Sequence, residues 1–380
     1  MIRIVADEKI PFLRGALERV ARVDYLPGSA IRKADLLTAD ALITRTRTKC
    51  NRELLEGTGI KFIASATIGY DHIDTVYCKQ GGISWTNAPG CNSSSVQQYL
   101  VSALLYLSNT RDLDLKKMTL GVIGVGNVGS KVASAAEKLG MKTLLNDPPR
   151  QRREGPDGFV GLKELLSDSD IITLHVPLNR SGQDPTWHMV NESFLQQVRR
   201  GAVLINTSRG EVVDESALRQ AIQVQTVSEV VLDVFETEPE IQPGLLELVT
   251  LATPHIAGYS LDGKANGTIA SVRSVSRFFN LGLDQWEPES LPLPGHPEIL
   301  ADTSGKELPE ILWEIFRQTY DISSDDRRLR ADPSAFETLR GDYPLRREPP
   351  AYAVRLFQGY PEIISVLEGL GFSVLGDYCA

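Results

Sequence analysis

The chain has 380 residues, of which 42% are hydrophobic and 23% are charged. This composition excludes a wholly disordered, collagen-like or coiled-coil protein, and the length predicts two or three domains. The 40 basic and 49 acidic residues give a net charge of −9, which argues against nucleic acid or an anionic membrane as the main partner.

The N-terminal part of the chain alternates short apolar runs with helical patterns. Ile2–Val5, Ala41–Thr44 and Phe62–Ala66 are expected to be buried parallel strands, and residues 96–107 a helix with leucines on one face. We expect no signal peptide, because the chain enters a strand directly, and no spanning helix, because its longest uncharged stretch is too polar. The expected location is therefore the cytoplasm, without membrane contact.

A second series of strands and helices follows. Its expected strands are Leu120–Ile123, Thr143–Asn146, Ile171–Leu174, Ala202–Asn206, Val230–Val234 and Leu251–Thr253. The intervening residues fit the crossover helices of right-handed βαβ units. The predicted fold class is α/β, with a Rossmann-like, doubly wound parallel sheet beside a flavodoxin-like substrate domain.

The C-terminal residues form a further module. Five prolines between residues 284 and 310 predict a linker. Apolar patterns predict a helix over 311–322 and then a strand, a helix and a strand at 351–357, 363–370 and 372–375. The charge-rich segments 325–330 and 342–348 are expected on the surface. We therefore expect the tail to form a small α/β module.

A GxGxxG motif separates the strand that ends at residue 123 from a helix expected over 128–139. Gly124 permits the tight turn, Gly126 lets the backbone approach a pyrophosphate, and Gly129 lets the helix pack closely on the strand. Asn127 and Val128 begin the helix, whose N-terminus supplies N–H groups and partial positive charge to phosphates. The motif therefore predicts a dinucleotide site.

Asp147 ends the next strand, 18 residues after the last glycine of the motif. A carboxylate at about this spacing accepts hydrogen bonds from the adenosine ribose and repels a 2′-phosphate. We therefore expect NAD rather than NADP as the cofactor. Arg150 lies close by and weakens this expectation if it faces the ribose. The four cysteines show no zinc-binding spacing, so no metal site is expected.

Three successive strand ends carry residues suited to oxidising a hydroxy acid. Such a reaction needs a base for the hydroxyl proton, a carboxylate to orient the base, and a cation for the substrate carboxylate. Arg209, Glu238 and His255 each follow one of the expected strands, where open α/β sheets bind ligands. Taken singly, each residue also fits an ordinary surface loop; together they predict a catalytic set.

The segments around these residues resemble the three signatures of the D-isomer-specific 2-hydroxyacid dehydrogenases. They are Ile205–Gly210, Asp233–Pro239 and Thr253–Gly258, and the resemblance runs from about residue 1 to about residue 280. It implies that Arg209 binds the substrate carboxylate, and that Glu238 pairs with His255, the acid/base.

The same resemblance implies further cofactor contacts. Asp233 matches a position near the nicotinamide carboxamide, and Thr207, Ser208 and Gly258 fall within the matching motifs. Formate dehydrogenases of the superfamily use Gln where Glu238 stands, which argues against formate as the substrate.

More of the chain is similar to one branch of this family, which oxidises 4-phospho-D-erythronate at C2 in pyridoxal 5′-phosphate (vitamin B6) biosynthesis. The matching segments are Ala66–His72, Ala88–Asn92, Asp147–Arg150, Pro254–Tyr259, Phe336–Arg340 and Pro344–Glu348. The last two lie in the tail, which resembles the C-terminal dimerisation domain of that branch. The resemblance therefore implies a homodimer.

The branch also implies substrate contacts. Thr46, Thr67 and Tyr259 match its substrate-binding positions, and Arg45 lies in a basic loop suited to a phosphate or a hydroxyl group. The implied domains are residues 1–95 with 259–283 for the substrate, 96–258 for NAD, and 284–380 for the linker and the dimerisation domain.

Two alternatives stay open. Another D-2-hydroxyacid dehydrogenase, such as a 3-phosphoglycerate dehydrogenase, shares the three motifs, but the tail argues against it. An NAD-sensing, corepressor-like binding protein keeps the fold without the chemistry, and the intact set of Arg209, Glu238 and His255 argues against that.

Overall fold

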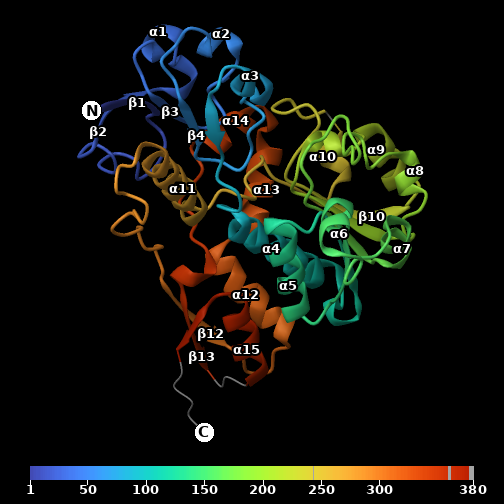
Figure 1. Cartoon of the computed structure of the whole chain (residues 1–380). Coiled ribbons are helices and arrows are strands. Elements are labelled where there is room, and N and C mark those ends of the chain that lie inside the picture. Colours follow the sequence, from blue (N-terminus) through green and yellow to red (C-terminus); the bar gives the residue numbers. More distant parts are fainter. Residues whose placement is uncertain (243, 358–360, 376–380) are drawn as a thin grey trace. The chain divides into compact units, whose positions relative to one another are not determined.

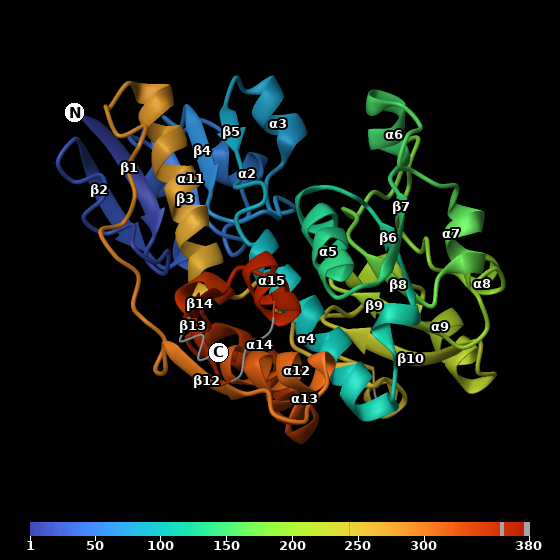
Figure 2. The same cartoon turned by 90° about the horizontal axis from the view of Figure 1, so that it is seen from below.

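The computed structural model describes residues 1–242, 244–357 and 361–375 (Figures 1 and 2). The chain divides into two compact units. The first comprises Met1–Asn92 with Ser260–Pro292, and the second comprises Ser93–Tyr259 with Leu293–Ala380. The functional assignment of 1–95 with 259–283, 96–258 and 284–380 stays a prediction.

The first unit is built on a parallel sheet with the strand order β2-β1-β3-β4-β5, the flavodoxin-like order. Its strands are β1 (Ile2–Asp7), β2 (Ala21–Leu26), β3 (Ala41–Thr44), β4 (Phe62–Ser65) and β5 (Ser84–Thr86). Its helices are α1 (Lys33–Leu36), α2 (Arg52–Leu55), α3 (Thr75–Gln80) and α11 (Leu261–Phe279). The three expected strands are confirmed. The apolar pattern does not reveal β2 and β5, because β2 is only partly buried and β5 is three residues long.

Helix α11 follows the second series of strands in the sequence but covers the sheet of the first unit, as Figure 2 shows. Its Val272 and Val275 are fully buried in one cluster with Ile4 and Ile43 from the strands. The close approach needs a small residue, since a Cβ at Gly267 would lie 2.2 Å from the carbonyl oxygen of Ala66. The unit is therefore completed by a segment that follows the second series of strands.

The second unit contains a parallel sheet with the order β11-β10-β9-β8-β6-β7. Its strands are β6 (Thr119–Ile123), β7 (Lys142–Asn146), β8 (Ile171–Leu174), β9 (Ala202–Asn206), β10 (Val227–Leu232) and β11 (Leu251–Ala252). Its helices are α4 (Ser93–Arg111), α5 (Asn127–Lys138), α6 (Pro148–Glu154), α7 (Leu162–Asp168), α8 (Glu192–Leu195), α9 (Glu215–Gln223) and α10 (Leu245–Leu248). The strand order reverses beside β6, which creates the crevice where open α/β sheets bind ligands. The predicted Rossmann-like sheet is confirmed.

A separate small sheet in the same unit is formed by the tail. Its order is β12-β13-β14, again parallel. The strands are β12 (Glu298–Asp302), β13 (Ala353–Phe357) and β14 (Ser373–Leu375), and the helices are α12 (Leu308–Thr319), α13 (Ile322–Ala331), α14 (Phe336–Gly341) and α15 (Pro361–Gly369). Side chains of α12, β13 and α15 belong to the same apolar cluster as those of α4 and α5. The tail therefore shares a core with the Rossmann-like sheet.

Two expectations about the tail are wrong. The proline-rich stretch is not only a linker, because it contains β12, where Ile299 and Ala301 are buried and pair with β13. The charge-rich segments are not simply surface, since Asp325 is 5% and Arg346 4% exposed. Specific hydrogen bonds allow these charges to be buried, and composition alone does not reveal such partners.

No helix in the described part of the chain is both long enough and apolar enough to cross a membrane.

Candidate active site

The glycine motif forms the turn between β6 and α5. Gly124 has φ +87°, a left-handed conformation that glycine adopts without strain. A Cβ at Gly129 would lie 2.0 Å from the carbonyl oxygen of Gly124, so only glycine permits this packing. Gly126 is exposed and has open space in front of its Cα, while Asn127 and Val128 start α5. The turn therefore fits a pyrophosphate against the helix N-terminus.

Asp147 accepts hydrogen bonds from backbone N–H groups of two segments, the glycine turn after β6 and the start of α6. Its Oδ2 accepts a hydrogen bond of 2.8 Å from Val125 N, and its Oδ1 accepts one of 2.9 Å from Arg150 N. The Arg150 side chain donates to Val125 O at 2.7 Å and to Glu154 Oε2 at 2.6 Å. Arg150 is thus paired with Glu154 and bonded to the same glycine turn that Asp147 contacts.

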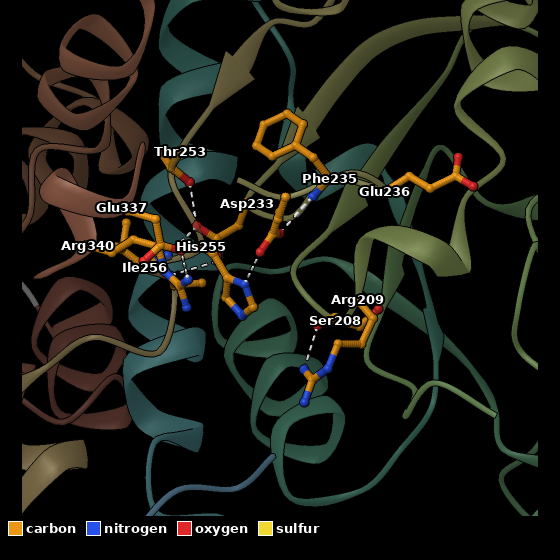
Figure 3. A network of polar contacts seen from close by, with 12 residues as sticks. Ser208, Arg209, Asp233, Phe235, Glu236, Thr253, His255, Ile256, Glu337 and Arg340 are labelled. Atoms are coloured by element: carbon orange, nitrogen blue, oxygen red, sulfur yellow. Dashed lines mark hydrogen bonds and ion pairs between the residues drawn. The ribbon is translucent and has the colours of Figure 1, made fainter. Parts of the chain in front are cut away.

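Arg209, Glu238 and His255 follow the carboxyl ends of β9, β10 and β11, and β10 is the middle strand of these three. Parallel strands bring their carboxyl ends to one edge of the sheet, so the topology gathers the three residues there. Figure 3 shows the guanidinium of Arg209 and the imidazole of His255 extending toward the same region. The expected grouping at one edge is therefore present in the structure.

Glu238 and His255 form a hydrogen-bonded pair. His255 Nδ1 lies 2.7 Å from Glu238 Oε2, and Phe235 N donates to Glu238 Oε1 at 2.9 Å. The two side chains keep 30% and 20% of their surface exposed. Because a carboxylate can only accept, Nδ1 carries the proton and Nε2 is the basic nitrogen.

Asp233 supports the backbone around His255. It is 1% exposed and accepts hydrogen bonds from Thr253 Oγ1 at 2.6 Å, Ile256 N at 2.7 Å and Ala257 N at 2.9 Å. Burial raises the pKa of Asp233 to about 6, although His255 and these hydrogen bonds oppose the rise. His255 itself has φ +55°, an unusual value for a residue with a side chain, and its N–H donates to Asp233 O at 2.7 Å.

Hydrogen bonds also hold the loop that carries Arg209 in place. Asn206 Nδ2 donates to Arg209 O at 2.9 Å, and Ser208 N donates to Asn206 Oδ1 at 3.0 Å. The Arg209 guanidinium donates to Ser208 O at 2.8 Å. Gly210 lies against the next loop, since a Cβ there would be 1.9 Å from Phe235 O. These contacts fix the point from which the guanidinium projects.

The half-buried His175 bridges the ends of two neighbouring strands. His175 Nε2 lies 3.0 Å from Thr173 Oγ1, and its Nδ1 lies 3.4 Å from Thr207 Oγ1. Burial lowers the pKa of His175 to about 3, so the ring is neutral at physiological pH. Thr207 and Ser208 stay predicted cofactor contacts, as does Gly258, which is partly buried in the loop after His255.

Three of the four predicted substrate contacts lie in the first unit. Arg45 and Thr46 follow β3, and Thr67 follows the adjacent β4, so they share one edge of the first sheet. The Arg45 guanidinium is paired with the fully buried Asp7, with Nε 2.9 Å from Oδ2. Thr67 Oγ1 lies 2.8 Å from Ser65 Oγ. Their contact with substrate stays a prediction.

The tail reaches the fourth predicted substrate contact, Tyr259. The Tyr343 ring packs edge-on against Tyr259 at 5.9 Å, and the Arg340 guanidinium carbon lies 5.8 Å from the centre of the Tyr259 ring. Figure 3 shows Arg340 and its ion-pair partner Glu337 in the same view as His255. The hydrophobic pattern of the sequence does not predict that the tail lies near this loop, because Arg340 is more than 80 residues away from His255 in the sequence.

Family comparisons agree with this geometry. A model described as "D-isomer specific 2-hydroxyacid dehydrogenase, NAD binding domain" matches residues 100–257. A second model, described as a domain of unknown function, matches residues 291–370. A solved structure of D-lactate dehydrogenase from Aquifex aeolicus, complexed with NAD and lactic acid, is 31% identical with a TM-score of 0.61 and covers 74% of this chain and 97% of that one.

Two curated relatives match over nearly their full length. Erythronate-4-phosphate dehydrogenase of Bacteroides thetaiotaomicron is 50% identical over 354 residues, which is 93% of this chain and 99% of the relative. The protein of the same name from Pseudomonas putida (strain F1) is 41% identical over 376 residues, or 97% and 98% of the two chains. These relatives are enzymes, which speaks against a corepressor-like protein. The chain belongs to the erythronate-4-phosphate dehydrogenase family, within the NAD-dependent D-isomer-specific 2-hydroxyacid dehydrogenases.

Proposed function

We propose that the protein oxidises 4-phospho-D-erythronate at C2 to (R)-3-hydroxy-2-oxo-4-phosphooxybutanoate with NAD, a step of pyridoxal 5′-phosphate biosynthesis. The observation that carries the proposal is the His255–Glu238 pair at 2.7 Å, on the same sheet edge as Arg209. The relatives' name supplies the substrate. When bound, NAD accepts the hydride that leaves C2.

His255 takes the hydroxyl proton in this proposal. Its Nδ1 proton is bonded to Glu238, so Nε2 is the atom that accepts the proton from the C2 hydroxyl as the hydride leaves. The imidazolium that results is stabilised by the Glu238 carboxylate. Glu238 in turn keeps its orientation through the bond from Phe235 N. Base and orienting carboxylate are therefore already arranged.

The substrate has an anion at each end, a carboxylate and a phosphate. Arg209 suits the carboxylate, because its planar fork binds two oxygens at once. Arg45, Thr46, Thr67 and Tyr259 are the proposed contacts for the rest of the molecule. Asp233 and the segment from Thr207 to Ser208 are proposed to adjoin the nicotinamide half of NAD, and Gly124–Gly129 with Asp147 to hold its adenosine half.

The test is NADH formation with three acids: 4-phospho-D-erythronate, unphosphorylated erythronate and 3-phosphoglycerate. We expect the phosphorylated four-carbon acid to have the highest kcat/KM, and loss of the phosphate to lower it strongly, because a charge-assisted phosphate contact is lost. Preference for 3-phosphoglycerate would instead identify another member of the wider family. No turnover with any of the three would contradict the proposal.

We further propose that the protein forms a homodimer through its tail, in the cytoplasm, where its phosphorylated substrate and NAD are held. On the outer face of the small sheet, Leu300 and Phe357 are 57% and 51% exposed, although they lie in the middle of β12 and at the end of β13. Exposed apolar side chains on a sheet face are typical of protein–protein contacts. Sedimentation of the Leu300→Glu variant should give a monomer where the wild type gives a dimer; a monomeric wild type would contradict this.

A further inference from the structure

The loop that carries His255 is held by two sets of hydrogen bonds, one to its N–H groups and one to its carbonyl groups. On one side, the Asp233 carboxylate accepts the N–H groups of Ile256 and Ala257, the two residues that follow His255. Thr253, two residues before His255, donates to the same carboxylate. The N–H groups of the loop are thus satisfied from within the Rossmann-like sheet, and its carbonyl groups need other partners.

Arg346 of the tail donates hydrogen bonds to two of those carbonyl groups. Its Nη1 donates to Ile256 O at 3.3 Å, and its Nη2 donates to Ala257 O at 2.6 Å. The same Nη2 donates to the backbone oxygen of Ser95 at 3.3 Å and also to the Ser95 hydroxyl, which itself donates to Ala257 O at 2.9 Å. One guanidinium therefore joins the loop after His255 to the start of α4.

The surroundings of Arg346 fix its position. The side chain is 4% exposed, and its guanidinium carbon lies 4.4 Å from the Tyr320 ring centre and 6.0 Å from that of Tyr343. The Tyr343 hydroxyl donates to the buried Asp325 at 2.6 Å, so the ring of Tyr343 is itself held in place. A buried cation enclosed in this way has little freedom to move.

We propose that Arg346 is a positioning residue: by holding the carbonyl groups of Ile256 and Ala257, it keeps His255 aligned with Glu238. The tail, which matches a family model without an assigned role, then completes the active site of its own subunit. The effect on turnover rests on the proposed function of His255, whereas the effect on the loop does not.

Two substitutions test the proposal through turnover. Arg346→Ala and Arg346→Lys should each lower kcat about 10- to 100-fold, as small misplacements of catalytic groups do, with little change in the KM for NAD. Arg346→Lys should recover little of the kcat that Arg346→Ala loses, because an ammonium cannot reach the separate acceptors that the guanidinium joins. Added guanidinium ion at millimolar concentration should partly restore kcat in Arg346→Ala by occupying the vacated space.

Arg330 offers a matched control. It also lies in the tail and donates from its guanidinium to backbone oxygens of the Rossmann-like part, Leu246 O, Val249 O at 2.9 Å and Thr250 O at 3.4 Å. Those oxygens precede β11, whereas His255 follows it. Arg330→Ala should therefore destabilise the fold without lowering kcat.

Hydrogen–deuterium exchange gives a readout that does not depend on turnover. Arg346→Lys should speed exchange at the N–H groups of Ile256 and Ala257, and Arg330→Ala should speed exchange only around residues 246–251. The proposal is overturned if exchange in residues 253–258 matches the wild type, or if both variants lower kcat equally. A wild type inactive with every 2-hydroxy acid would contradict the proposed function alone, since the exchange result still decides the role of Arg346.

Discussion

Glu238→Gln is the substitution that most directly probes the histidine–carboxylate pair. Glu238 uses one oxygen for His255 Nδ1 at 2.7 Å and the other for Phe235 N at 2.9 Å. An amide has a single oxygen, so it satisfies only one of these donors. Either the NH₂ group faces Phe235 N–H, or it faces Nδ1 and forces the proton onto Nε2, the nitrogen needed as the base.

The structure sets the size of the expected effect. A hydrogen bond between an imidazolium and a carboxylate contributes about 1.5–3 kcal/mol. The pair is only partly buried, with 30% and 20% of the side chains exposed, so water weakens it and the middle of that range applies. A loss of about 2–2.5 kcal/mol in the transition state corresponds to a kcat about 30- to 70-fold lower.

The assay is steady-state NADH formation from 4-phospho-D-erythronate, with NAD affinity measured separately. Glu240→Gln is the control, because Glu240 is exposed on the same loop and its replacement removes the same charge. We expect kcat to fall in Glu238→Gln and to stay unchanged in Glu240→Gln. An unchanged kcat in Glu238→Gln, or an equal fall in both variants, would refute the assigned role of the pair.

Three further predictions concern the carboxylate cation, the cofactor and pH. Arg209→Lys should lower kcat/KM about 10- to 100-fold, because an ammonium does not bind two oxygens side by side; wild-type kinetics would contradict this. Asp147→Ala should raise kcat/KM for NADP relative to NAD and lower the unfolding free energy by about 1 kcal/mol, since the helix α6 N-cap is lost. Burial raises the pKa of Asp233 from 3.8 to about 6. Between these two pH values the carboxyl group of Asp233 keeps its proton in the folded chain and loses it in the unfolded chain. The free energy of unfolding should therefore decline by about 3 kcal/mol as pH rises from about 4 to about 6, and denaturant titrations of Asp233→Asn should lack that decline.

The apolar runs predict most of the central strands, because a parallel strand is buried on both faces and leaves a continuous hydrophobic segment in the sequence. Ile171–Leu174 and Ala202–Asn206 are found as expected, and the helix α4 begins and ends within four residues of the expected bounds. (The expected range is 96–107 and the observed one is 93–111.) The strand β12 escapes this reasoning, since prolines surround it and only one of its faces is buried.

In the active site, residues within short motifs are predictable from the sequence, whereas contacts between distant residues are not. Arg209, Glu238 and His255 are predictable because each lies in a short motif directly after a strand. The bonds from Arg346 to the loop after His255 are not predictable, because they join residues that are 89 and 90 positions apart. In the sequence, Arg346 lies in a run of charges typical of a solvated surface, and only the fold shows which carbonyl groups it meets.

Single-turnover hydride transfer in His255→Ala is the most direct test of the account. With NAD and 4-phospho-D-erythronate pre-bound, the rate of NADH appearance should fall about 10²- to 10⁴-fold relative to the wild type, as expected for loss of a general base, while the Kd for NAD stays the same. A rate close to that of the wild type would show that another group removes the hydroxyl proton.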